Sequence, residues 1–241
     1  MKLKAEQIKT KFSKAECIST KEVYRFYQQE EPEIKRATVN WRIYELVQRG
    51  ILRRIGKGKF VVGRSIPYVP EISSTEKRIN NVIHKEFPFI KYCIWSTSKL
   101  NELLQHQISI QCTVVEAERE VLESVYHKLK DQIHQTFKKP SKEMVEEFIS
   151  SQKNSVVIKT LISESPLQTI KNIPTSSLEK LLVDLYCDKN LFYFLQGNEL
   201  VNVFRNAFDK YTINQSKLLR YADRRQKKIQ IEELIKSINR Q

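Results

Sequence analysis

The sequence predicts a mixed α/β (α+β) protein made of a small N-terminal part and a larger second part. Stretches with helical and strand periodicity alternate along most of the 241 residues, which indicates that both kinds of element are layered together. Hydrophobic residues make up 40% of the chain and glycine is scarce, with 5 residues, so a packed core is expected nearly throughout.

The first 64 residues show three helical stretches followed by a short hairpin. The helices are expected over residues 3–12, from the Ser19-Thr20 N-cap onward, and over residues 36–49, with Gly50 ending the third. Two β-like runs, residues 51–55 and 59–62, flank the tight-turn sequence Gly56-Lys57-Gly58. This order is typical of a winged helix-turn-helix domain, which we expect over residues 1–64.

The third helix carries the main functional prediction. Val39, Ile43, Leu46 and Val47 recur at helical spacing and indicate its buried side. The N-terminal residues of such a helix reach base edges in the major groove, where Arg and Asn pair with guanine and adenine. The residues expected to contact bases are Arg36, Thr38, Asn40, Trp41 and Arg42. Trp41 either contacts a thymine methyl group or a sugar, or packs under the hairpin.

Cations concentrate on and around the hairpin. The side chains expected to bind backbone phosphates are Lys35, Arg53, Arg54, Lys57 and Lys59, and Arg64 follows directly. A basic exposed hairpin without a partner is the alternative, and winged helices also serve as protein-interaction modules.

The distribution of charge favours a polyanionic partner. The net charge is +14, and residues 1–64 hold 16 Lys and Arg against 7 Asp and Glu. Residues 210–241 hold 9 against 3, whereas residues 65–209 are close to neutral with 17 against 18. Positive charge at both ends of a chain is typical of nucleic-acid binding, although a solvated helix face explains the C-terminal block equally well.

A linker is expected over residues 65–74, because prolines interrupt the pattern there, and a second domain over residues 75–241. Strands are expected over residues 90–95, 108–115 and 155–162, and helices over 97–106, 118–132 and 176–188. Residues 199–238 read as helical in three pieces. The second domain is therefore a mixed α/β domain that ends in helices.

Catalytic signals in the second domain are weak. Glu116 closes an expected strand, where a metal-dependent nuclease could hold a ligand, but no lysine follows at nuclease-like spacing. Asp184, four residues after Lys180, is expected to form a surface ion pair. We expect no catalytic residue, cofactor or metal site, although a nuclease-like enzyme stays open as an alternative.

A basic helix face is formed by Arg220, Arg224 and Arg225, which could contact DNA, grip an acidic partner or be solvated. The four cysteines are scattered and match no zinc or disulfide spacing, so reduced thiols and a cytoplasmic location are expected. No apolar run is long enough for a membrane span.

Two stretches of the N-terminal part resemble the winged helix of the AbiEi-type antitoxins. They are Thr38-Val39-Asn40-Trp41-Arg42-Ile43-Tyr44-Glu45-Leu46 and the run from Arg49-Gly50 to Gly58-Lys59-Phe60. Trp95-Ser96-Thr97 and Ser177-Leu178-Glu179-Lys180-Leu181-Leu182-Val183-Asp184 are similar to segments of that family's second domain.

The resemblance implies a transcriptional autorepressor and antitoxin of a type IV toxin–antitoxin, or abortive-infection, system. Its partners would be double-stranded operator DNA and, functionally, a nucleotidyltransferase-like toxin. The resemblance places the same third-helix residues in the DNA groove and the hairpin cations on phosphates.

Overall fold

The computed structural model describes residues 3–104, 108, 110–152 and 154–238. The chain divides into two compact units. The N-terminal unit comprises Met1–Tyr68 with Lys210–Lys217, and the second unit comprises Val69–Asp209 with Leu218–Gln241. The predicted mixed α/β class is confirmed, because both units combine helices with sheets.

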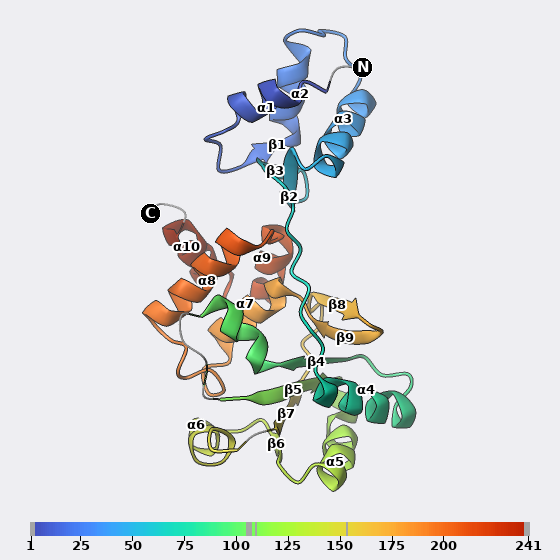
Figure 1. The fold of residues 1–241 in the computed structure, drawn as a ribbon, viewed down its shortest axis with the longest axis vertical. Coiled ribbons are helices and arrows are strands. Elements are labelled where there is room, and N and C mark those ends of the chain that lie inside the picture. The colour runs from blue at the N-terminus through green and yellow to red at the C-terminus, as the bar shows by residue number, and fades with distance from the viewer. Residues whose placement is uncertain (1–2, 105–107, 109, 153, 239–241) are drawn as a thin grey trace. The chain divides into compact units, whose positions relative to one another are not determined.

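The N-terminal unit contains three helices and a three-stranded antiparallel sheet (Figure 1). In chain order the elements are α1 (Ala5–Lys11), β1 (Ile18–Ser19), α2 (Thr20–Gln28), α3 (Arg36–Gln48), β2 (Leu52–Gly56) and β3 (Lys59–Val62). The three helices and the hairpin expected from the sequence are present. The two-residue strand β1 was not predicted, and it pairs with β3 through Ile18 opposite Phe60.

Local capping fixes the ends of α2 and α3. Ser19 and Glu22 form a capping box at the start of α2, in which each side chain accepts a hydrogen bond from the other residue's backbone N–H. At the end of α3, the N–H of Ile51 donates to the carbonyl of Leu46, and the N–H of Gly50 donates to that of Val47. Gly50 has a φ of 69°, the left-handed conformation that this type of helix end requires.

The second unit is built on a four-stranded mixed sheet. Its strands are β4 (Tyr92–Ser96), β5 (Cys112–Ala117), β6 (Thr136–Lys138) and β7 (Ser155–Thr160). They lie in the order β4-β5-β7-β6, in which β4 is antiparallel to β5 and the other neighbours are parallel. A separate hairpin joins β8 (Leu167–Ile170) to β9 (Ile173–Ser176).

One face of this sheet is apolar and covered by α4 (Ser74–Glu86) and α5 (Leu122–Gln132). Ile94, Val115 and Ile158 pack there against Ile79 and other buried residues of the two helices. Because side chains alternate along a strand, the residues between them point to the opposite face.

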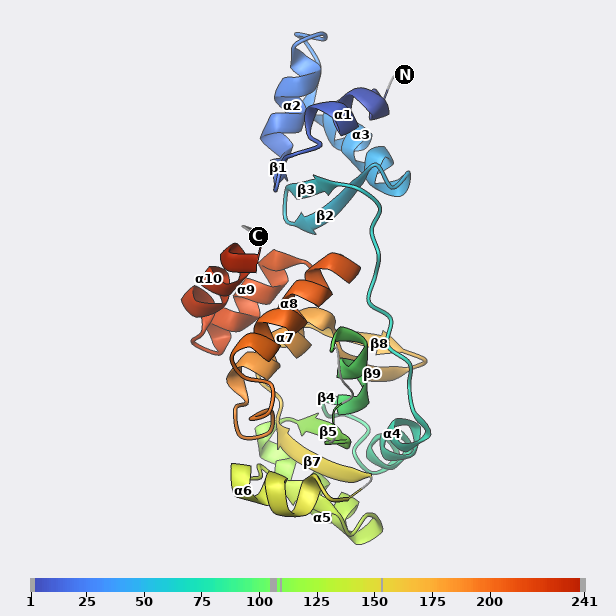
Figure 2. The same cartoon turned by 60° about the vertical axis from the view of Figure 1, so that its left-hand side comes forward.

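That opposite face carries the charged residues Glu116 and Lys159, which lie opposite each other on β5 and β7. This face contacts α7 (Leu178–Cys187). On the same side of the sheet as α7 lie three more helices, α8 (Asn198–Lys210), α9 (Gln215–Arg224) and α10 (Lys228–Ile238) (Figure 2). Four short elements complete the unit: η1 (Thr97–Leu103), η2 (Arg119–Val121), α6 (Lys142–Met144) and η3 (Val145–Ile149).

The expected strands and helices of the second part occur with shifted bounds. The strand expected from residue 108 begins at Cys112, and the helix expected over residues 97–106 is the 3-10 helix η1, the end of that range lying outside the described residues. The three C-terminal helical pieces are confirmed as α8, α9 and α10. The helix α4 and the strands β6, β8 and β9 were not predicted. Every described helix is too short or too polar to cross a membrane.

Candidate nucleic-acid interface

The exposed side of α3 has the character expected of a contact surface. Val39, Ile43 and Leu46 are buried in the core of the N-terminal unit, as predicted. Trp41 and Tyr44 are 46% and 57% exposed on the other side, and Arg36 and Asn40 are exposed beside them. Exposure of large aromatic side chains to water is unfavourable. A pair of them among polar groups is typical of a surface that binds a macromolecule.

The N-terminus of α3 has a positive electrostatic character that attracts an anion. Lys35 occupies the N-cap position and makes no side-chain capping bond, and the first turn contains no acidic residue. The first backbone N–H groups of a helix lack partners within the helix and carry a partial positive charge. Lys35 and Arg36, both exposed, add two full charges at the same end.

A groove of about 630 Å³ lies between α2 and α3 and is lined by cations from both helices. Lys21 and Arg25 come from α2, and Arg36 and Asn40 come from α3. Thr20, the first residue of α2, also lines this groove. Its backbone N–H donates a 2.9 Å hydrogen bond to the carbonyl of Gly58, which ties the hairpin turn to the start of α2.

Arg42 does not belong to this surface, and its assignment as a base-contacting residue is wrong. The residue is 4% exposed because it follows Val39 by three positions and precedes Leu46 by four, which places it on the buried side of α3. Its guanidinium donates bonds of 2.9 and 2.8 Å to the two carboxylate oxygens of Glu31 and lies over the ring of Tyr27. The hydrogen bonds from Arg42 also hold the pKa of Glu31 below its ordinary value.

The hairpin cations fall on two faces. Arg53 and Arg54 are adjacent on β2 and therefore point to opposite sides of the sheet. Arg54 is exposed but lies over the ring of Phe60, 5.3 Å from its centroid, whereas Arg53 is half-buried. Lys57 in the turn and Lys59 at the start of β3 are exposed, so these two are the hairpin cations best placed to reach a phosphate.

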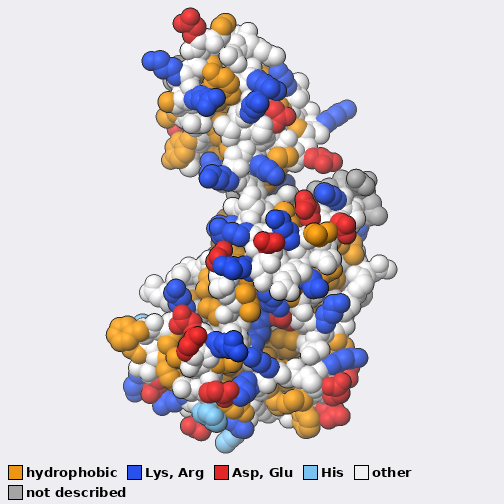
Figure 3. Space-filling view, turned by 180° about the vertical axis from the view of Figure 1, so that it is seen from behind, with side chains coloured by type: hydrophobic (Ala, Val, Ile, Leu, Met, Phe, Trp, Pro, Cys, Tyr) orange, Lys and Arg blue, Asp and Glu red, His pale blue; other side chains and the backbone are white. Residues whose placement is uncertain are grey.

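Of the remaining predicted residues, Thr38 is half-buried and Arg64 lies past β3, beside Gly50. Lys and Arg side chains are spread over the face of the N-terminal unit seen in Figure 3. Arg36 and Asn40 therefore line the same groove, whereas Arg42 is buried and does not line it.

Sequence reasoning missed the two cations of α2. Lys21 and Arg25 are four residues apart, and Gln28 continues the same stripe, so all three share the exposed face of this helix. The spacing is visible in Lys21-Glu22-Val23-Tyr24-Arg25, but the winged-helix pattern directs attention to the third helix and the hairpin.

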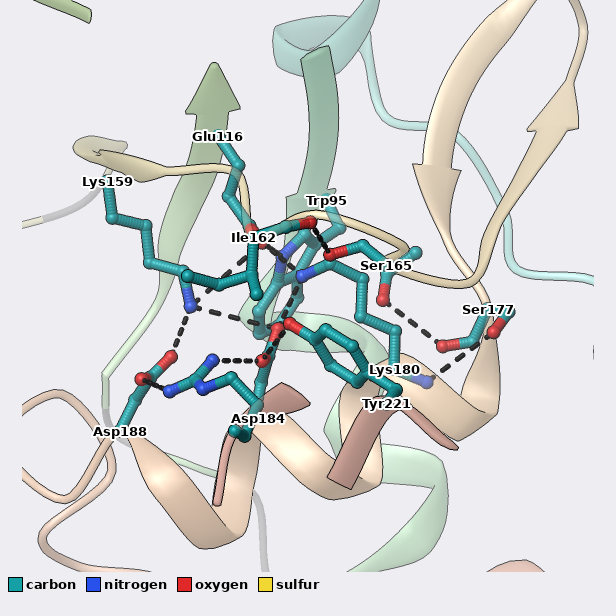
Figure 4. Close-up of polar contacts among 12 residues, drawn as sticks. Trp95, Glu116, Lys159, Ile162, Ser165, Ser177, Lys180, Asp184, Asp188 and Tyr221 are labelled. Atoms are coloured by element: carbon teal, nitrogen blue, oxygen red, sulfur yellow. Dashed lines mark hydrogen bonds and ion pairs between the residues drawn. The ribbon is translucent and has the colours of Figure 1, made fainter. Parts of the chain in front are cut away.

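The second unit holds a different cluster, a buried network of charges on the α7-facing side of the sheet (Figure 4). The ammonium of Lys180 lies 2.5 Å from Oε1 of Glu116 and also bonds to Asp184, and all three side chains are fully buried. The indole N–H of Trp95 donates to the same Glu116 oxygen, at 3.1 Å. The hydroxyl of Tyr221 donates to Asp184 at 2.8 Å.

The network extends to the surface through Lys159 and Asp188. Lys159 is bonded to Asp188 and lies 3.7 Å from Asp184 and 4.0 Å from Glu116. Arg225 of the chain segment after α9 bonds to both Asp184 and Asp188, at 2.6 and 2.5 Å. Three acids and three bases therefore balance one another.

Mutual pairing shifts the pKa values of Asp184 and Lys180 toward their charged forms despite the burial of both side chains. Burial raises the pKa of Asp184, but Lys159, Lys180 and Arg225 outweigh it, so this pKa lies below its ordinary value. For Lys180, burial lowers the pKa, but the carboxylates of Asp184 and Glu116 outweigh that effect and raise it well above its ordinary value. Asp184 and Lys180 consequently both favour their charged forms at neutral pH.

These contacts correct one expectation and describe the surroundings of Glu116. The Lys180–Asp184 pair exists, but it is buried rather than on the surface, because α7 covers the charged face of the sheet. Glu116 is fully buried and held by a lysine and a tryptophan, which is the setting of a structural ion pair. Among the described residues, no group of three or more His, Cys, Asp or Glu side chains is placed to hold a metal ion.

The arginines of the predicted basic face have separate roles. Arg225 belongs to the buried network, and Arg224 is bonded to Glu164. Arg220 is largely exposed and lies 3.9 Å from the same glutamate. All three arginines of this face therefore lie within 3.9 Å of acids of the second unit.

Fold and site together define a two-unit α/β protein with a basic three-helix N-terminal unit and a second unit stabilised by a buried charge network. The chain belongs to DUF6577, a family of unknown function, whose model matches residues 38–241. The matched range begins within α3 and includes the hairpin and the whole second unit. None of the curated proteins compared with the chain matches it.

Proposed function

We propose that this protein is a transcriptional regulator that binds double-stranded DNA through a winged helix-turn-helix in its N-terminal unit. One observation carries the proposal: Lys21, Arg25, Arg36 and Asn40 line a single groove between α2 and α3, and Thr20 of the same groove is hydrogen-bonded to the hairpin turn. The element order, with α3 followed by a basic β2–β3 hairpin, supports the same assignment.

In this proposal the two helices contact different parts of the duplex. On α3, Asn40 and the exposed Trp41 and Tyr44 face the major groove, where an amide side chain pairs with adenine and aromatic groups contact thymine methyls. On α2, Lys21 and Arg25 neutralise backbone phosphates, which fixes position without reading sequence. Lys57 in the hairpin turn reaches a further phosphate along the duplex.

The finer proposal, an autorepressor and antitoxin of a type IV toxin–antitoxin system, rests on the resemblance of residues 38–60 to AbiEi-type antitoxins. It requires a nucleotidyltransferase-like toxin gene beside the gene for this chain. Co-expression tests it directly: this protein should restore growth to cells that express the neighbouring toxin. Growth arrest that persists despite full expression would remove the antitoxin role and leave DNA binding untouched.

The test of DNA binding compares duplexes by fluorescence anisotropy. One duplex carries the region upstream of the protein's own gene, and the other is a shuffled sequence of equal length. Asn40→Ala should reduce the preference for the upstream duplex, because a good bidentate base contact contributes about 1–3 kcal/mol of discrimination. Lys57→Ala should weaken binding to both duplexes alike, because a phosphate contact carries no sequence information.

Arg49→Ala is the matched control, because Arg49 caps the far end of α3 and pairs there with Glu45. This variant should bind both duplexes like the wild type. If the wild-type chain binds neither duplex at low salt, or if all three variants lose the same affinity, the proposed interface is wrong.

A further inference from the structure

A pocket of about 350 Å³ lies at the β6–β7 edge of the second unit, on the sheet face that carries the charge network. Val157 of β7 contributes to its lining, and the segment that follows α7, including Leu191, lines it as well. Its size lies within the range of about 300–1,000 Å³ that is typical of small-molecule sites.

The pocket is strongly cationic. Its charged lining residues are Lys139, Lys159, Lys189 and Asp188, which gives an excess of two positive charges. Lys139 and Lys189 are exposed, and neither ammonium group forms a hydrogen bond or ion pair with any other residue that the structure describes. Two exposed ammonium groups without a bonded partner among the described residues, on one small pocket, favour a dianionic ligand.

The charge network leaves Lys159 able to serve such a ligand. If its ammonium turned into the pocket, Asp188 would keep its 2.5 Å bond to Arg225. Asp184 would keep bonds to Arg225 and to Lys180, and Lys180 would also remain on Glu116. Every buried carboxylate therefore retains a cationic partner without Lys159, which avoids the cost of an unpaired buried charge.

We propose that this pocket binds the phosphate group of a small phosphate monoester. The dianionic phosphate lies among Lys139, Lys159 and Lys189, whose ammonium groups form strong charge-assisted hydrogen bonds with phosphate oxygens. The organic group of the ligand packs against the apolar side chains of Val157 and Leu191. The site lies wholly in the second unit, so it does not depend on DNA binding by the first.

Isothermal titration calorimetry on the full chain tests this proposal with two probes, phenyl phosphate and inorganic phosphate, at constant ionic strength. Phenyl phosphate should bind saturably at one site per chain and more tightly than inorganic phosphate. The double variant Lys139→Ala with Lys189→Ala should weaken binding roughly tenfold or more, because a hydrogen bond between charged groups contributes at least that much.

The control is Lys77→Ala with Lys85→Ala, which removes the same charge from two exposed positions on α4, the helix that packs on the opposite face of the sheet. It should bind phenyl phosphate like the wild type. Both double variants change exposed side chains and should unfold at the wild-type temperature. No saturable binding of either probe to the wild type, or equal weakening in the control, overturns the proposal. Binding of inorganic phosphate as tight as that of phenyl phosphate overturns the assignment of an organic ligand.

Discussion

The salt dependence of DNA binding offers a quantitative test of the α2–α3 groove. Five exposed cations that line the groove or flank the hairpin turn are the proposed phosphate contacts: Lys21 and Arg25 on α2, Arg36 on α3, and Lys57 and Lys59 on the hairpin. Each neutralised phosphate contributes about 0.9 to the slope of log affinity against log salt, so the wild type should show a slope of about −4.5. Between about 50 and 200 mM salt, the affinity should then fall roughly 500-fold.

The double variant Lys21→Ala with Arg25→Ala removes two of these contacts. Its slope should be about −2.7, and its affinity should fall only about 40-fold over the same range of salt. Fluorescence anisotropy with one duplex at four salt concentrations measures both slopes. The variant Lys77→Ala with Lys85→Ala, which loses the same charge from α4, should keep the wild-type slope. An unchanged slope in the α2 variant would refute the idea that this groove holds the DNA backbone.

The remaining predictions concern stability and the corrected role of Arg42. Lys180→Ala leaves Glu116 short of its closest cation and should lower the free energy of unfolding by about 3–5 kcal/mol, measured by urea denaturation. Because the folded-state pKa of Asp184 lies below its ordinary value of 3.8, its contribution is complete above about pH 4 and is lost as the pH falls. Asp184→Asn should therefore flatten the loss of stability that denaturation curves show between about pH 4 and pH 2. Gly50→Ala should cost roughly 1–2 kcal/mol, seen as a lower melting temperature, since φ there is 69°. Arg42→Ala should also lower the melting temperature yet leave the salt slope of DNA binding unchanged, and a smaller slope would return Arg42 to the interface.

Local patterns made the N-terminal unit predictable. The helical spacing of Val39, Ile43 and Leu46, the stop at Gly50 and the Gly56-Lys57-Gly58 turn each depend on neighbouring residues, and each reappears in the structure. The strand β1 was missed because two residues are too short for any periodicity to show, and its existence depends on a partner strand some forty positions away.

The fate of Arg42 shows the limit of such reasoning at the site. Helical periodicity placed it on the flank of α3, and only the position of Glu31 decides whether a flanking arginine turns inward or outward. Glu31 lies in the loop between α2 and α3, and a sequence does not show which way a loop folds back.

The charge network could not be predicted either, because most of its residues are far apart in the sequence. Its charged members come from β5, β7, α7 and the segments that follow α7 and α9, and only Lys180 and Asp184 are close enough in sequence to suggest a pair. A charged residue inside a strand that is otherwise uncharged, such as Lys159 in Ser155–Thr160, is the kind of hint that the sequence offers, because burial of a lysine demands acidic partners.

The two tryptophans of the chain fall one in each unit, and their surroundings differ sharply. Trp41 is 46% exposed, whereas Trp95 is fully buried, stacked on Phe192 with ring centroids 5.9 Å apart. Their fluorescence should therefore separate into a red-shifted component from the first unit and a blue-shifted one from the second. A single emission spectrum can then follow each unit on its own, so that a ligand's arrival at Trp41 and the opening of the core around Trp95 are told apart without any added label.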